Sequence, residues 1–138
     1  MPQVGQEIKR ANGYMVRIVR LEDDLLEVEA HYVGDAPLAQ AHYHPTQDEH
    51  FEVLSGRIHA VVDGDERWYD EGARFDIPAG TTHQMAADGP TVLKWQVRPA
   101  LRTAEFFERF YDALDNGFPE GTTAQDFLDE YSDVFRLA

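Results

Sequence analysis

The chain has 138 residues and no cysteine, which excludes disulfides and thiolate metal sites. Its formal net charge of −14 disfavours nucleic acid and anionic membrane surfaces as partners, because both require clustered lysine and arginine. The sequence has no apolar run near the roughly 18 residues of a membrane span and no export signal at its start. We therefore expect one globular, cytoplasmic domain over residues 1–138.

The first two thirds of the chain predict β structure. Short runs of strand-forming residues are separated by turn signals such as Gly56, Asp63-Gly64 and Pro78-Ala79-Gly80, a pattern typical of a β-sandwich or barrel over about 13–98. The predicted strands cover residues 14–20, 25–33, 38–44, 49–55, 57–62, 66–70, 73–77, 82–87 and 91–98.

The last third predicts α-helices, over about 101–136. In the first helix, Phe106, Phe110 and Leu114 recur every four residues, and Asn116-Gly117 indicates its end. We expect the helices to pack on the outside of the barrel or in a dimer interface, as amphipathic helices generally bury their apolar stripe. A lid over a ligand site is the alternative.

A second helix is predicted over 123–136. Thr122 and Gln125 resemble a capping box, which marks the start of a helix. The apolar residues beyond them form one stripe, consisting of Phe127, Tyr131, Val134 and Phe135.

Four residues form a pattern suited to a metal ion. His42, His44 and Glu49 have the spacing H-x-H-x4-E, and His83 follows a turn further along the chain. Side chains two apart on a strand point the same way, so His42 and His44 can reach one ion, and the turn formers at 45–48 allow Glu49 to return to it. This ligand set suits one divalent transition ion, Fe, Mn, Ni, Cu or Zn.

Strand alternation also predicts the neighbours of such an ion. Gln40 shares a face with His42 and His44, and Met85 shares one with His83. An apolar cavity with a few polar groups is typical of a small-molecule site. The predicted pocket is lined by Gln40, Phe51, Val53 and Met85.

Two segments resemble the motifs of the cupin family. Residues 41–56, AHYHPTQDEHFEVLSG, are similar to the first motif, G-x5-H-x-H-x(3,4)-E-x6-G. Residues 72–83, GARFDIPAGTTH, are similar to the second, G-x5-P-x-G-x2-H-x3-N. Ala36 replaces the first glycine and Ala87 the closing asparagine, but neither position is a metal ligand in the family.

This resemblance to small single-domain bacterial cupins covers roughly 13–98. It implies a mainly β jelly-roll barrel, here followed by C-terminal α-helices, with one metal ion inside near its open end. It also implies a tendency to form homodimers. The fold itself does not determine the activity.

Our leading functional hypothesis is a metal-dependent enzyme that acts on a small oxygenated organic molecule. Dioxygenase chemistry is favoured, with decarboxylation and isomerisation as alternatives, and Glu49 is the candidate catalytic base. The hypothesis from another class is a non-catalytic cupin that binds a metal or small ligand as a sensor or carrier. The remaining histidines (His31, His50 and His59) are interpreted as bystanders, and Trp68 and Trp95 as core residues.

Overall fold

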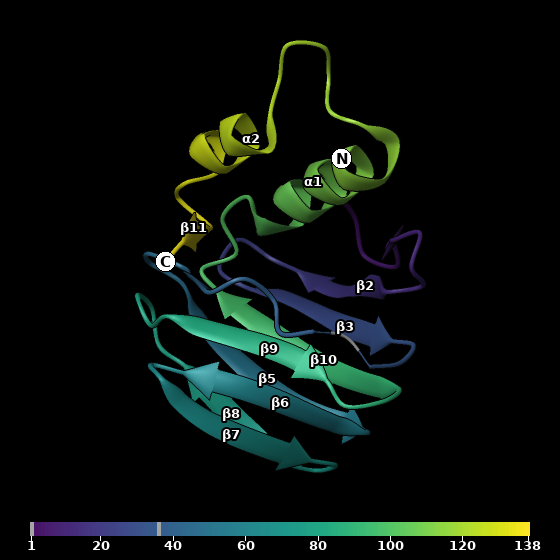
Figure 1. Ribbon diagram of the computed structural model, residues 1–138, viewed down its shortest axis with the longest axis vertical. Coiled ribbons are helices and arrows are strands. Elements are labelled where there is room, and N and C mark those ends of the chain that lie inside the picture. The colour runs from purple at the N-terminus through teal and green to yellow at the C-terminus, as the bar shows by residue number, and fades with distance from the viewer. Residues whose placement is uncertain (1, 36) are drawn as a thin grey trace.

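The structure, a computed structural model, describes residues 2–35 and 37–138, so Ala36 lies outside the described residues. Two antiparallel sheets face each other as a mainly β jelly-roll barrel, as predicted (Figure 1). One sheet has six strands, in the order β1 (Glu7–Lys9), β2 (Met15–Leu21), β3 (Leu26–Tyr32), β10 (Thr91–Arg98), β5 (Asp48–Ser55) and β8 (Arg74–Ile77). The other has five, in the order β11 (Arg136–Leu137), β4 (His42–Tyr43), β9 (His83–Ala87), β6 (Arg57–Val62) and β7 (Asp65–Asp70).

The predicted strands agree with the structure to within one residue at each end, except over 38–44, and the short strands β1 and β11 are not predicted. The strand expected over 38–44 is shortened to β4. Ala39 makes a single backbone hydrogen bond to Met85 O at 3.1 Å, while the side chain of Gln84 donates to Ala39 O at 3.0 Å. The side chain of Gln84 thus takes the place of one backbone hydrogen bond between β9 and the segment before His42.

The core lies between the two sheets. Along β6, Ile58, Ala60 and Val62 are buried, whereas the residues between them point outward. The same alternation along β5 buries Glu49 together with Phe51. Because successive side chains of a strand point to opposite faces, one face of each sheet supplies the core and the other faces solvent.

The helices are α1 (Thr103–Asn116) and α2 (Ala124–Glu130). Gly117 ends α1 as predicted, with φ +98° and its N–H donating to Ala113 O at 2.8 Å. The capping box of α2 is formed by Thr123 and Asp126, one residue later than predicted. No helix in the described part of the chain has the length and apolar character needed to cross a membrane.

The second helix is shorter than predicted. It stops at Glu130, and residues 131–134 form turns that lead into β11. Arg136 pairs there with Tyr43, and Leu137 with His42. Turn hydrogen bonds, such as that from Val134 N to Tyr131 O at 2.9 Å, and the pairing of β11 with β4 thus replace the predicted helix.

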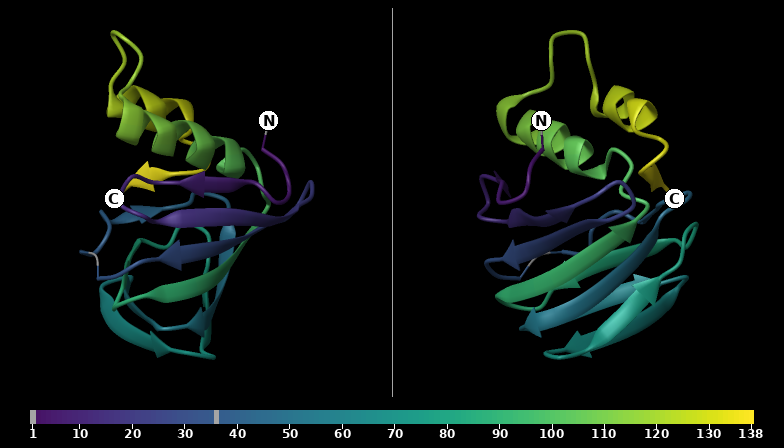
Figure 2. Two further views of the ribbon diagram at one scale, coloured as in Figure 1. Left: turned by 90° about the vertical axis from the view of Figure 1, so that its right-hand side faces the viewer. Right: turned by 180° about the vertical axis from the view of Figure 1, so that it is seen from behind.

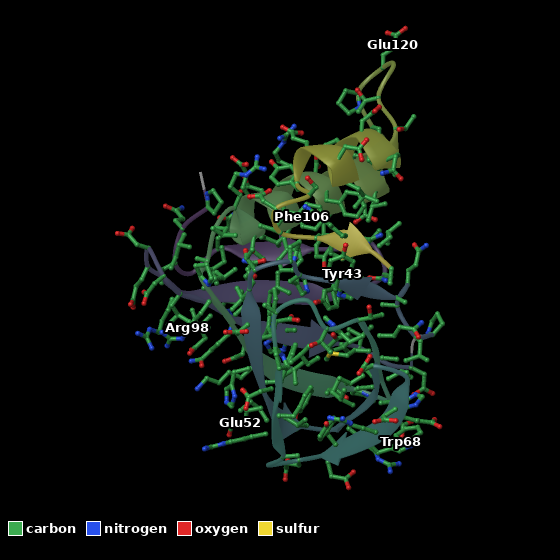
Figure 3. The ribbon with its side chains drawn as sticks, turned by 90° about the vertical axis from the view of Figure 1, so that its left-hand side faces the viewer. Tyr43, Glu52, Trp68, Arg98, Phe106 and Glu120 are labelled. Atoms are coloured by element: carbon green, nitrogen blue, oxygen red, sulfur yellow. The ribbon has the colours of Figure 1, made fainter. Side chains whose placement is uncertain are left out.

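Both helices lie over one end of the barrel, together with β11 (Figure 2). Figure 3 shows Phe106 between the helices and the barrel, whereas Trp68 lies at the opposite end of the molecule. Side chains of α1 and α2 line the same cavity as His42 and His83. The first helix thus packs against the barrel, as predicted, and side chains of both helices also line the cavity.

Candidate metal centre

Three histidines converge at the end of the barrel that the helices cover. Strand pairing sets His42 of β4 directly opposite His83 of β9, and their ring centroids lie 4.4 Å apart. His44 follows β4 and lies 5.2 Å from the ring of His42. One nitrogen from each of the three residues lies within 4.8 Å of the others, so the cluster can hold a metal ion.

Backbone carbonyls fix the orientation of all three imidazoles. Nδ1 of His42 lies 2.9 Å from Gln40 O, and Nδ1 of His83 lies 2.9 Å from Thr81 O. Nδ1 of His44 lies 2.6 Å from Val134 O. A carbonyl oxygen can only accept, so each Nδ1 carries a proton and Nε2 is the ring nitrogen available to a metal ion. Such partners set the tautomer of histidines that bind metals.

Glu49 of β5 is the carboxylate nearest to this cluster. Its Oε1 lies 3.3 Å from His44 Nε2 and 3.2 Å from His83 Nε2. Trp95 Nε1 donates to Oε2 of Glu49 at 2.7 Å. Oε1 itself is buried without a hydrogen-bond partner among the described residues. A buried polar atom without a partner is costly, and a cation shared with the histidines would satisfy it.

The electrostatics of the cluster also fit a cation. Burial, followed by the charge of His83, lowers the pKa of His42 to about 4, which keeps its imidazole neutral. Burial alone would raise the pKa of Glu49, but interaction with His83 and the nearby imidazoles outweighs it and lowers this pKa. Burial likewise opposes a charge on His83, but Glu49 outweighs it and raises the pKa of His83. The ionised carboxylate of Glu49 therefore stabilises positive charge beside the histidines.

A cavity of about 690 Å³ opens beside the histidines. Of the predicted pocket residues, Gln40, Phe51 and Met85 line it. Val53 lies elsewhere, since it is not a lining residue and is 0% exposed within the hydrophobic core. Although β5 directs Val53 to the same face as Glu49, it sits opposite Leu93 of β10 and is sealed from the cavity.

Sequence reasoning missed several residues of the site. The sequence predicts Trp95 only as a core residue, although its inward position between Leu93 and Val97 places it beside Glu49. Phe135 stacks on His42 with centroids 4.7 Å apart. Neither Phe135 nor the carbonyl of Val134 has a local sequence signal, because a fold-dependent strand pairing brings them to the histidines.

Trp68 is predicted to be a core residue, but this prediction is wrong. It is 47% exposed and stacks on His59, with ring centroids 4.0 Å apart. The guanidinium carbon of Arg57 lies 4.4 Å from its ring centroid. These side chains share the outer face of β6 and β7, where His59 pairs with Trp68. His59 accordingly lies outside the barrel.

Residues 28–97 match the family profile described as Cupin domain. The chain belongs to the cupin family. Among solved structures, KdgF from Halomonas sp. superposes with a TM-score of 0.62 at 20% identity, covering 72% of this chain and 94% of that one. An RmlC-like cupin from Shewanella frigidimarina has a TM-score of 0.61 at 17% identity, covering 72% and 87%.

A eukaryotic cupin is also similar. The cupin domain of Schizosaccharomyces pombe Cnp3 superposes with a TM-score of 0.54 at 15% identity, covering 70% of each chain. At these identities the similarity establishes the fold alone. No curated protein matches the chain by sequence.

Proposed function

We propose that this cupin is a metal-dependent enzyme that acts on a small oxygenated organic molecule. The observation that carries the proposal is the orphaned Oε1 of Glu49, which faces the Nε2 atoms of His44 and His83. The cavity beside these atoms favours a catalytic role of the ion over a purely structural one. It gives a substrate access to the donor atoms.

His42, His44, Glu49 and His83 would hold the ion. A divalent ion supplies Lewis acidity toward an oxygen-donor substrate, and a redox-active one also supplies electron transfer to dioxygen. The three backbone carbonyls hold the imidazoles in one tautomer, so the donor atoms require little reorganisation on binding. Dioxygenase chemistry is the favoured reaction class, with decarboxylation and isomerisation as the alternatives.

Glu49 has a second role in this proposal, as the base that takes a proton from the substrate. Its lowered pKa keeps it ionised at neutral pH, and Oε1 would take the proton after leaving the ion, as a carboxylate in a crowded set of ligands can do. Trp95 holds Oε2 at 2.7 Å, which fixes the plane of the carboxylate. The mainly apolar cavity wall lowers the local dielectric and so strengthens these interactions.

The test is elemental analysis of protein purified without a histidine tag or chelator, for the wild type and two variants. We expect one divalent transition ion per chain in the wild type, none in His44→Ala, and full occupancy in His31→Ala. His31 is the matched control because it pairs with Glu29, away from the cluster, at 3.0 Å.

Activity is then tested on each metal-loaded form. Oxygen consumption and product analysis are followed with a panel of enediols, β-diketones, catechols and keto acids. We expect turnover that disappears in Glu49→Gln. Retention of metal by His44→Ala would refute the metal centre, whereas stoichiometric metal without conversion of any substrate would favour the sensor or carrier.

A further inference from the structure

The cavity beside the histidines carries almost no charge. Its lining among the described residues includes no lysine or arginine, and Glu49 is its one carboxylate. The whole chain has a net charge of −14, which repels anions at long range. Away from the histidines and the proposed ion, a ligand in this cavity would find no cationic side chain to pair with a carboxylate or phosphate. These charges favour a neutral ligand.

Aromatic rings form a continuous wall from the candidate metal ligands into the cavity. Trp95 donates a hydrogen bond to Glu49, and its ring centroid lies 5.3 Å from that of Phe107 of α1. Phe107 in turn stacks on Tyr111 at 5.2 Å and 22°. All three of these rings line the cavity. Flat aromatic surfaces stack favourably on other aromatic rings, which favours a planar ligand.

Three tyrosines form a second set of polar residues in the cavity lining, besides the histidines and Glu49. Tyr14 precedes β2, Tyr32 ends β3 and Tyr111 belongs to α1, whereas the histidines come from the opposite sheet. The ring centroid of Tyr14 lies 4.8 Å from that of Tyr32 and 6.0 Å from that of Tyr111. All three line the cavity.

The phenols of this tyrosine cluster remain protonated. Burial, with the neighbouring phenols, raises the pKa of Tyr14 well above its usual value, and burial raises that of Tyr111 to about 12. Each hydroxyl can therefore donate or accept a hydrogen bond at neutral pH. A cavity with apolar walls and a few convergent polar groups is the usual form of a specific small-molecule site.

We propose that the substrate of this cavity is a neutral, largely aromatic molecule with oxygen functions at two ends. One end carries the oxygen donors that approach the histidines and Glu49. The other carries a hydroxyl or carbonyl that hydrogen bonds with the cluster formed by Tyr14, Tyr32 and Tyr111. The assignment of the first end rests on the proposed metal-dependent function; the aromatic body and the tyrosine end do not.

The test measures binding by calorimetry with three β-diketones that share one chelating head. Acetylacetone has no ring, benzoylacetone adds a phenyl group, and 4-hydroxybenzoylacetone adds a distal hydroxyl. We expect metal-loaded protein to bind benzoylacetone at least about 10-fold more tightly than acetylacetone, as burial of a phenyl ring predicts. The distal hydroxyl should add about 3- to 10-fold, the value of one hydrogen bond.

Tyrosine variants separate the two ends of the ligand. At least one of Tyr14→Phe, Tyr32→Phe and Tyr111→Phe should lose the gain from the distal hydroxyl, while its affinity for benzoylacetone is unchanged. Tyr69→Phe is the matched control, because its ring stacks on Phe75 at 3.8 Å and is not part of the cavity lining. It should retain the full gain. Retention of the gain in all three cavity variants would overturn the tyrosine end.

The outcomes distinguish this proposal from the function on which it rests. Equal affinity for all three diketones, or tighter binding of the anionic polyol acid gluconate, overturns the substrate class even where the metal is bound. Elemental analysis of the same samples tests the metal independently. If the purified protein holds no metal and still prefers benzoylacetone to acetylacetone, the aromatic cavity is supported and the metal-dependent function fails.

Discussion

Nδ1 of His44 lies 2.6 Å from the carbonyl oxygen of Val134, 90 residues further along the chain. The next residue, Phe135, stacks on His42, and β11 then pairs with β4. The C-terminal segment therefore orients two of the candidate ligands as well as covering the cavity. Metal binding and the docking of this segment should be thermodynamically coupled, because each favours the same arrangement of the histidines.

Phe135→Ala tests this coupling. The substitution removes the ring stacked on His42, and we expect metal affinity to fall about 5- to 10-fold, near the lower limit for loss of a residue that orients a metal ligand. Competition with a chromophoric chelator measures the change. Phe118→Ala is the matched control, since Phe118 packs on Phe127 at 5.4 Å within the helical cluster. Equal loss of affinity in both variants would mean that the effect reflects general destabilisation.

Trp95→Phe tests the support of Glu49. Phenylalanine keeps an aromatic ring in the wall but removes the indole N–H that donates to Glu49 Oε2 at 2.7 Å. We expect metal affinity to fall about 10-fold, as for other residues that orient a ligand. Trp68→Phe, on the outer face, should leave affinity unchanged. An unaltered affinity in Trp95→Phe would show that Glu49 does not need this hydrogen bond.

The sequence identified those parts of the fold and site that depend on local signals. Alternation predicted β6 and β10 with their observed bounds, and turn residues predicted the positions between strands. The spacing of His42 and His44 predicted that they converge, because a strand directs both to one side. Each of these properties is set within a few neighbouring residues.

The parts that escaped prediction depend on distant contacts. β1 and β11 are short strands that form only by pairing with β2 and β4, and their sequences carry little pattern. The hydrogen bond from His44 goes to a backbone carbonyl, a group that every residue possesses. The apolar stripes of the helices predicted that they would be buried, but did not decide between packing outside the barrel and lining a cavity.

Gly56→Ala tests the turn between β5 and β6. Gly56 has φ +85°, and a Cβ there would lie 2.4 Å from Pro90 O. Gly64 has φ +83°, but a Cβ would meet nothing within 4 Å. We expect Gly64→Ala to cost about 1–2 kcal/mol of unfolding free energy, the cost of a left-handed backbone. Gly56→Ala should cost at least about 2 kcal/mol more, because backbone must shift. Urea unfolding measures both, and equal losses would contradict the close approach.

Alkaline pH should destabilise the fold through Tyr111. Burial raises its pKa from 10.0 to about 12, so the unfolded chain loses this proton before the folded protein does. The contribution to stability is therefore complete below pH 10 and is lost as the pH rises toward 12. Two pKa units correspond to about 2.7 kcal/mol, and partial access from the cavity reduces this to about 2 kcal/mol.

The measurement compares urea unfolding at pH 8 and pH 11 for the wild type and Tyr111→Phe. The variant lacks the ionisable hydroxyl but keeps the ring that stacks on Phe107 at 5.2 Å. It should lose less stability than the wild type between the two pH values, with the remainder due to Tyr14 and Tyr32, whose pKa values burial also raises. An identical loss in both proteins would show that Tyr111 is not shielded in the folded state. In that case its hydroxyl would face water instead of a ligand cavity.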